Sequence, residues 1–150
     1  MIKIIGIGNI LMSDDGISMK IIDSIEDKLM KLGLELECVK AETDLDYALD
    51  CIDNGDTVVI IDSTNFGIEC GELTVVPLDK GRLYENNRFF MHNISLISSI
   101  NKAELYIDGL IIGIEVDRIC FNMELSKKLE SRFEDITKEV YEIIYRCIVS

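Results

Sequence analysis

The chain has 150 residues, of which 48% are apolar, and this size and apolar content suit one domain with a buried core. Its formal net charge of -13 repels nucleic-acid phosphates and anionic lipid headgroups, and no local cluster of Lys and Arg offsets that charge. We therefore expect a single domain over residues 1–150 that binds neither nucleic acid nor membranes.

The cysteines and the amino terminus indicate the compartment. The five cysteines are odd in number and no two form a C-x-x-C pair, so neither a disulfide framework nor a structural zinc site is indicated. The opening "MIKIIGIG" leads directly into an apolar run, without the charged region and cleavage site of a signal peptide. No apolar run reaches the roughly 18 residues that span a bilayer. These features predict a soluble cytoplasmic protein with reduced thiols.

The amino-terminal half alternates predicted strands and helices. The apolar run at 2–8 predicts a strand covered on both faces, and the spacing of isoleucine and leucine over 16–31 predicts a helix. The less hydrophobic segment 34–41 is expected to form a strand nearer an edge of the sheet, and 44–53 a short helix. Residues 57–63, "TVVIIDS", begin with five β-branched residues and predict the central strand.

The carboxyl-terminal half continues the alternation. Its predicted elements are a strand at 71–78, a polar and aromatic loop at 79–91, a helix at 93–103, a strand at 110–116 and a long amphipathic helix at 125–148. The strand at 71–78 follows the central strand after about eight residues, too few for a helical crossover, so it is expected to be antiparallel. We therefore predict a three-layer α/β/α sandwich with a twisted, mostly parallel five-stranded sheet and helices on both faces.

Polar residues follow the ends of these strands, where α/β proteins collect their reactive groups. Asn9, Asp14 and Asp15 come after the first strand, Asp62 ends the central strand, and His92, the only histidine, precedes a helix. Two carboxylates and one imidazole suit Ni²⁺, Zn²⁺, Mn²⁺ or Fe²⁺ and leave positions open for water or substrate. In the structural alternative, Asp14 or Asp15 caps the following helix, Asp62 accepts backbone N–H bonds, and His92 is a satisfied surface or core residue.

Two other kinds of site fit less well. Gly6 and Gly8, which are expected to turn the chain sharply off the first strand, begin a dinucleotide-binding G-x-G-x-x-G motif. Leu11 occupies the third glycine position, the acidic pair that follows would repel a pyrophosphate, and no G-K-[ST] sequence makes a P-loop. A Ser/His or Cys/His nucleophile would need His92. No G-x-S-x-G elbow is present, and each cysteine lies in an apolar or amphipathic run, so a buried, inert thiol is expected.

Several motifs, taken in order, resemble the hydrogenase maturation endopeptidases. "GIGNILMSDDGIS" is similar to the amino-terminal signature of that family, "VVIIDST" to its second motif and "MHNISL" to its histidine motif. "CGELTVV", "IIGIEV" and "ELSKKL" are similar to other segments of the family, so the resemblance covers essentially the whole chain. It implies an enzyme that removes the carboxyl-terminal extension of a nickel-iron hydrogenase large-subunit precursor after nickel insertion.

The resemblance also implies which residues form the site. The metal-contacting acid, aspartate and histidine of the family fall on Asp15, Asp62 and His92, the expected catalytic and metal residues of an aspartic-type or metal-dependent endopeptidase. They would recognise nickel that the substrate carries, and other divalent metals would occupy the site in isolated protein. Whether nickel polarises the carbonyl, activates water or orients the substrate is left open.

The partner implied by the resemblance is the large-subunit precursor, and the enzyme is expected to be a monomer. Asp14 is then free to cap the helix, and Asn9 to shape the loop through side-chain to backbone bonds. The segment Glu42–Asp44 departs from the small G-G-T type turn of the family, on a loop placed to contact the partner. Two alternatives stay open: a non-catalytic, nickel-dependent assembly or chaperone module, and a related protease with another substrate.

Overall fold

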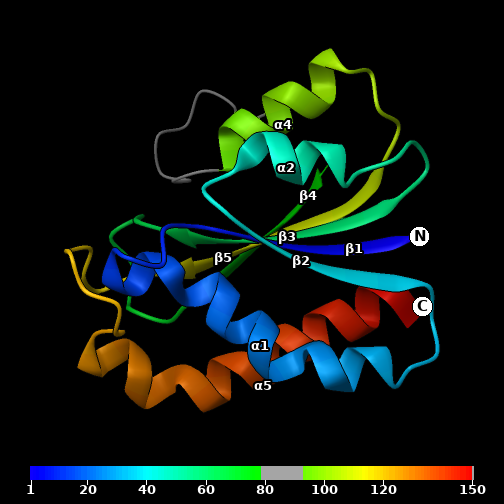
Figure 1. Cartoon of the computed structure of the whole chain (residues 1–150). Helices are drawn as coiled ribbons and strands as arrows, with labels where there is room; N and C mark the ends of the chain where they lie inside the picture. Colours follow the sequence, from blue (N-terminus) through cyan, green and yellow to red (C-terminus); the bar gives the residue numbers. More distant parts are fainter. Residues whose placement is uncertain (79–92, 150) are drawn as a thin grey trace.

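The computed structural model describes residues 1–78 and 93–149, in which five strands form one sheet in the order β2-β1-β3-β5-β4 (Figure 1). The strands are β1 (Ile2–Ile7), β2 (Leu36–Glu42), β3 (Thr57–Thr64), β4 (Leu73–Pro77) and β5 (Asp108–Glu115). β1 pairs in parallel with β2 and β3, and β3 pairs in parallel with β5, whereas β4 is antiparallel to β5. The predicted central strand, edge strand and antiparallel strand are all confirmed.

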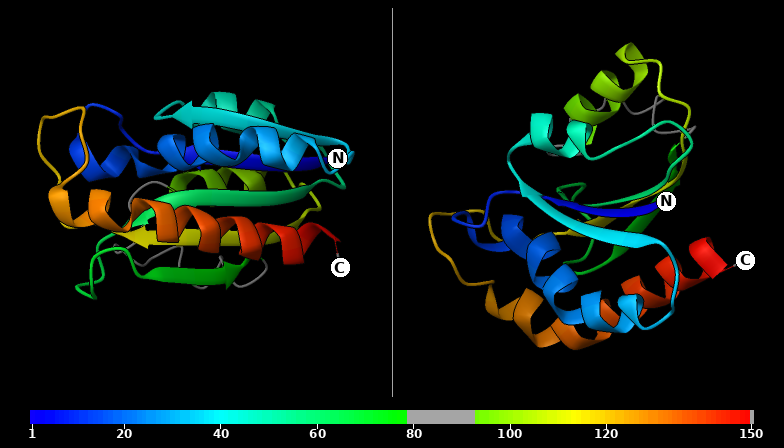
Figure 2. Two further views of the ribbon diagram at one scale, coloured as in Figure 1. Left: turned by 90° about the horizontal axis from the view of Figure 1, so that it is seen from below. Right: turned by 45° about the vertical axis from the view of Figure 1, so that its right-hand side comes forward.

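Helices cover both faces of the sheet, as expected (Figures 1 and 2). One face is covered by α1 (Ile17–Met30) and α5 (Lys127–Val149), and the other by α2 (Leu45–Asp50) and α4 (Asn93–Lys102). Alternate residues of β3 face opposite helix pairs, because side chains along a strand alternate between its two sides. Val59 and Ile61 pack with α1 and α5, whereas Val58 and Ile60 pack with α2 and α4. The three layers therefore share two apolar cores.

Two helical segments differ from the prediction. The short helix α2 begins after Asp44, whose carboxylate accepts the N–H of Tyr47 at 3.0 Å, and it ends at Asp50 rather than at residue 53. A short 3-10 helix, η1 (Ser13–Gly16), precedes α1 and was not expected. Among the helices in the described residues, none has the length and apolar character that crossing a membrane requires. The predicted loop at 79–91 lies outside the described residues.

Glycines allow η1 and α1 to approach β1 closely. Gly8 has a φ of +141°, and a Cβ atom there would lie 2.1 Å from the carbonyl oxygen of Asp15. Gly6 lies within β1, where a Cβ atom would lie 2.7 Å from Cδ1 of Ile22 in α1. Gly8 therefore serves the turn, as predicted, but the same role for Gly6 is wrong, because Gly6 permits close packing of a helix on the strand.

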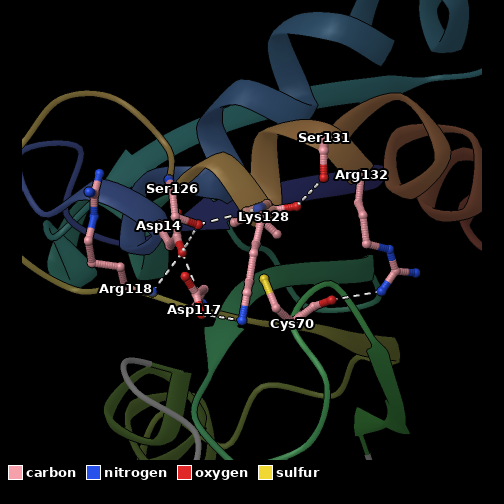
Figure 3. A network of polar contacts seen from close by, with 9 residues as sticks. Asp14, Cys70, Asp117, Arg118, Ser126, Lys128, Ser131 and Arg132 are labelled. Carbon is pink, nitrogen blue, oxygen red and sulfur yellow. Dashed lines mark hydrogen bonds and ion pairs between the residues drawn. The ribbon is translucent and has the colours of Figure 1, made fainter.

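Asp14 is fully buried and joins η1 to the segment between β5 and α5 (Figure 3). Its Oδ2 atom accepts hydrogen bonds from the N–H groups of Asp117 and Arg118, at 2.9 and 2.8 Å, and from the Ser126 hydroxyl at 2.8 Å. Its Oδ1 atom accepts the Ser126 N–H at 2.7 Å. The Ser126 oxygen in turn accepts the N–H of Leu129 in the first turn of α5, at 3.3 Å. Asp14 therefore supports the start of α5.

The expectation that Asp14 or Asp15 caps α1 is consequently wrong. The N-cap residue of α1 is Gly16, and no side chain makes a capping hydrogen bond there. The donors that Asp14 binds instead lie more than 100 residues further along the chain. A local sequence pattern carries no sign of such partners.

We expect Asp14→Asn to lower the free energy of unfolding by about 2–3 kcal/mol, because an amide nitrogen cannot accept the hydrogen bonds that one carboxylate oxygen accepts. Urea denaturation measures the difference. The matched control is Asp23→Asn, whose side chain is 59% exposed in a surface ion pair with Lys40 and whose loss costs less than about 1 kcal/mol. Equal losses of stability in the two variants would contradict the structural role of Asp14.

Candidate functional site

Asp15 follows Asp14 in η1 but contacts β3 instead of the segment before α5. It is 3% exposed. Its Oδ2 atom accepts the N–H of Asn9 at 2.9 Å, and its Oδ1 atom accepts the hydroxyl of Ser63 at 2.6 Å. Both oxygens are thus oriented by neutral donors, which hold the carboxylate at the carboxyl end of β3.

Asp62 lies in β3 immediately before Ser63 and is fully buried. Its Oδ1 atom accepts the N–H of Ser63 at 2.8 Å, the kind of backbone bond that the structural alternative expects. By the alternation of β3, Asp62 lies on the side of Val58 and Ile60, which α2 and α4 cover. Ser63 therefore contacts both predicted acids at the carboxyl end of β3, Asp62 through its N–H and Asp15 through its hydroxyl. By the same alternation, the Ser63 side chain that reaches Asp15 lies on the side of Val59 and Ile61, which α1 and α5 cover.

His92, the third predicted site residue, lies outside the described residues. The helix α4 begins at the next position and packs on the face of the sheet toward which Asp62 is placed. Within the described residues, no group of three or more His, Cys, Asp or Glu side chains is arranged to hold a metal ion. The complete set of Asp15, Asp62 and His92 therefore stays a prediction.

Thiol nucleophiles are disfavoured at several positions. Burial, assisted by the nearby carboxylates of Glu26 and Glu37, raises the pKa of the Cys38 thiol to about 12. Burial also raises the pKa of Cys70 and of Cys147. Because the thiolate is the reactive form, these three side chains are neutral and poorly nucleophilic near pH 7. This agrees with the expected inert thiols at these three positions, but all five cysteines are half-buried, so their expected full burial is wrong.

Two residues at the carboxyl ends of β3 and β5 were missed by sequence reasoning, Ser63 and Glu115. Glu115 ends β5, is 1% exposed, and accepts the hydroxyl of Thr64 at 2.9 Å. It also accepts the N–H groups of Phe66 and Gly67, at 2.9 and 3.0 Å, and so holds the segment after β3 against β5. The sequence held one indication of each: Glu115 is an acid at the end of a predicted buried strand, and Ser63 places a hydroxyl beside Asp62.

In the first loop, Asn9 makes the side-chain to backbone hydrogen bond that was expected. Its side-chain oxygen accepts the N–H of Leu11 at 3.0 Å, while its backbone N–H donates to Asp15.

A hollow of about 600 Å³ opens beside the ends of β3 and β5, with Glu115, Lys128 and Arg132 in its lining. Arg132 is held there by donating to the carbonyl oxygen of Cys70 at 2.7 Å (Figure 3). Of the buried acids at the ends of β3 and β5, Glu115 lines this hollow.

Comparison with known sequences gives one family. Residues 18–143 match the hydrogenase maturation protease family, HycI, which is more than half of the chain. This range contains Asp62 and His92 and begins after Asp15, so the place of Asp15 in the family depends on the amino-terminal signature. A comparison with curated proteins gives no match.

Solved structures show the same fold. The [NiFe] hydrogenase maturation protease HybD from Thermococcus kodakarensis superimposes with a TM-score of 0.76 at 19% identity, over 94% of this chain and 97% of that chain. The hydrogenase maturating endopeptidase HybD from E. coli gives a TM-score of 0.78 at 17% identity, over 97% of this chain and 91% of that chain. These likenesses establish the fold, and the match over residues 18–143 establishes that the chain belongs to the hydrogenase maturation protease family.

Proposed function

We propose that this protein is an endopeptidase that removes the carboxyl-terminal extension of a nickel-iron hydrogenase large-subunit precursor after nickel insertion. Family membership supports the role in hydrogenase maturation. The names of the structural relatives, [NiFe] hydrogenase maturation protease and hydrogenase maturating endopeptidase, support the reaction class. The proposal extends that role to nickel recognition by Asp15, Asp62 and His92.

The observation that supports this extension is the contact of two buried acids, Asp15 and Asp62, with one residue, Ser63, at the carboxyl end of β3. Asp15 and Asp62 are 3% and 0% exposed, so a cation that reaches them is only weakly screened by water. Carboxylate and imidazole groups suit a borderline divalent ion such as Ni²⁺. The hydrogen bonds from Asn9 and Ser63 orient Asp15 in advance, as partners of metal-binding carboxylates commonly do.

The neighbouring Asp14 has a different role in this proposal. Its oxygens accept hydrogen bonds from the segment before α5, whereas those of Asp15 accept bonds from Asn9 and from Ser63, the residue next to Asp62. Because Asp15 contacts the strand that contains Asp62, it is the acid of the first loop that we assign to nickel. The nickel arrives with the precursor, so binding it confirms that insertion is complete and holds the peptide bond to be cut beside the site. Hydrolysis then adds water across that bond and leaves a new carboxylate and a free amine.

We expect Asp15→Asn, Asp62→Asn and His92→Ala each to reduce processing of the nickel-loaded precursor by about 100-fold or more, because each removes one contact with nickel. Shortening of the precursor is followed by gel mobility and mass spectrometry. The control is Asp135→Asn, an exposed acid on α5, which leaves processing unchanged.

Circular dichroism and urea denaturation confirm that each variant is folded. A folded variant that carries both Asp62→Asn and His92→Ala and still processes the precursor at the wild-type rate would refute the assignment. A wild-type protein that binds the nickel-loaded precursor without shortening it would instead be a non-catalytic assembly module.

Ser63 gives a second test, because its hydroxyl orients Asp15 without contacting nickel itself. We expect Ser63→Ala to lower kcat for the nickel-loaded precursor by about 10-fold, the usual effect of removing a bond to a metal-contacting side chain. The matched control is Thr137→Val, since the Thr137 hydroxyl donates to the carbonyl oxygen of Phe133 in its own helix, at 2.7 Å. Wild-type kcat in folded Ser63→Ala would show that Asp15 needs no such orientation.

A further inference from the structure

Two loops beyond the carboxyl ends of β1 and β5 carry large apolar side chains that are exposed to solvent. Ile10 and Leu11 precede η1, and Ile119, Phe121 and Met123 lie between β5 and α5. We call these five residues the loop patch. Phe121 is 84% exposed and Met123 is 64% exposed. Large apolar side chains that gather on a surface commonly mark a site where another protein binds.

The two loops lie side by side beyond the ends of β1 and β5 (Figures 1 and 2), and hydrogen bonds join them. Met12 and Asn122 form a β-bridge. The N–H of Ser13 donates to the carbonyl oxygen of Asn122 at 2.6 Å, and the N–H of Asn122 donates to that of Leu11 at 2.9 Å. The Ser13 hydroxyl donates to the carbonyl oxygen of Glu124 at 2.8 Å.

This bonding holds the loop patch in one arrangement. Ser13 has a φ of +53°, an uncommon conformation for a residue other than glycine, which persists because its neighbours fix it. Asp14 adds the hydrogen bonds to Asp117, Arg118 and Ser126 described above. A partner that binds the patch therefore loses little free energy in ordering these loops.

A hollow of about 360 Å³ adjoins the loop patch. Its lining combines the apolar side chains of Ile10, Met19 and Met123 with the charged side chains of Lys20, Asp23, Lys40 and Glu42. Glu42 ends β2 with a φ of +56° and begins the Glu42–Asp44 segment that departs from the family pattern. The hollow has room for a side chain of a bound protein.

We propose that the loop patch is the docking surface for the folded body of the large-subunit precursor, which contacts it through apolar side chains. The inference rests on the proposed function, because it takes Asp15 as the place where the precursor presents its nickel. Ile10 and Leu11 belong to the same short connection as Asp15 and, unlike Asp15, they are exposed, so they are the part of this connection that a folded protein can touch. The docking surface is thus continuous with the proposed site.

The apolar character of the loop patch determines how the contact contributes to binding of the precursor. None of its five side chains is charged, whereas the chain as a whole carries a formal charge of -13. Binding by buried apolar area depends little on salt, and exposed aromatic side chains commonly supply much of the affinity of an interface. The loop patch therefore contributes affinity for the body of the precursor, whereas Asp15 and Asp62 make the proposed contacts with its nickel.

The test compares Phe121→Ser with Tyr106→Ser. Both side chains are 84% exposed, and Tyr106 lies before β5, at the opposite end of that strand. We expect Phe121→Ser to raise KM for the nickel-loaded precursor by about 10-fold or more with kcat unchanged, and Tyr106→Ser to change neither. Met123→Ser is also expected to raise KM. For both loop-patch variants, we expect the rise in KM to be the same at low and high salt.

Direct binding of the nickel-loaded precursor, measured by calorimetry, separates failure of the docking proposal from failure of the proposed function. Equal KM and Kd for Phe121→Ser and Tyr106→Ser, in a protein that processes the precursor, would overturn the docking proposal alone. Binding that weakens in Phe121→Ser without any processing by wild type would support docking and overturn the proposed function. A wild-type dimer that Phe121→Ser converts to a monomer in sedimentation, with KM unchanged, would assign the patch to a second copy and overturn the proposal.

Discussion

The hydrogen bonds to the buried carboxylate of Asp14 are the interactions on which the loops at the carboxyl ends of the parallel strands depend. This carboxylate accepts N–H and hydroxyl bonds from Asp117, Arg118 and Ser126, so the first loop and the segment before α5 are held as one unit. Hydrogen bonds to a charged acceptor are stronger than neutral ones, and a buried carboxylate that lost them would be strongly destabilised. Asp15 follows directly after this junction and contacts β3, and Phe121 belongs to the segment that the junction holds.

The short helix η1 explains how two adjacent acids come to have separate roles. Successive side chains of a 3-10 helix are turned by about 120°, because three residues complete one turn. Asp14 therefore contacts the segment before α5, while Asp15 contacts the end of β3. One acid stabilises the junction of the two loops, and the next one makes the proposed contact with nickel. The short β1–α1 connection thus combines a structural carboxylate, a proposed site carboxylate and part of the loop patch.

The sheet was predictable from sequence, and the polar network only in part. The apolar run of β3, the weaker hydrophobicity of β2 and the short connection to β4 gave the central strand, the edge strand and the antiparallel strand. The partners of Asp14 were not predictable, because they lie more than 100 residues away and a dipeptide before a helix equally fits a local cap. Ser63 was missed for a related reason: its place beside Asp62 was the only signal in the sequence, and its contact with Asp15 lies 48 residues away along the chain.

The most direct test of nickel recognition compares two forms of one large-subunit precursor, loaded with nickel and free of nickel. Each form is incubated with the wild-type protein, and mass spectrometry follows the loss of the carboxyl-terminal extension. If the two acids and His92 recognise nickel on the substrate, only the loaded precursor is shortened, because the empty one lacks the ion that those side chains contact. Cleavage of both forms at the same rate would contradict the account.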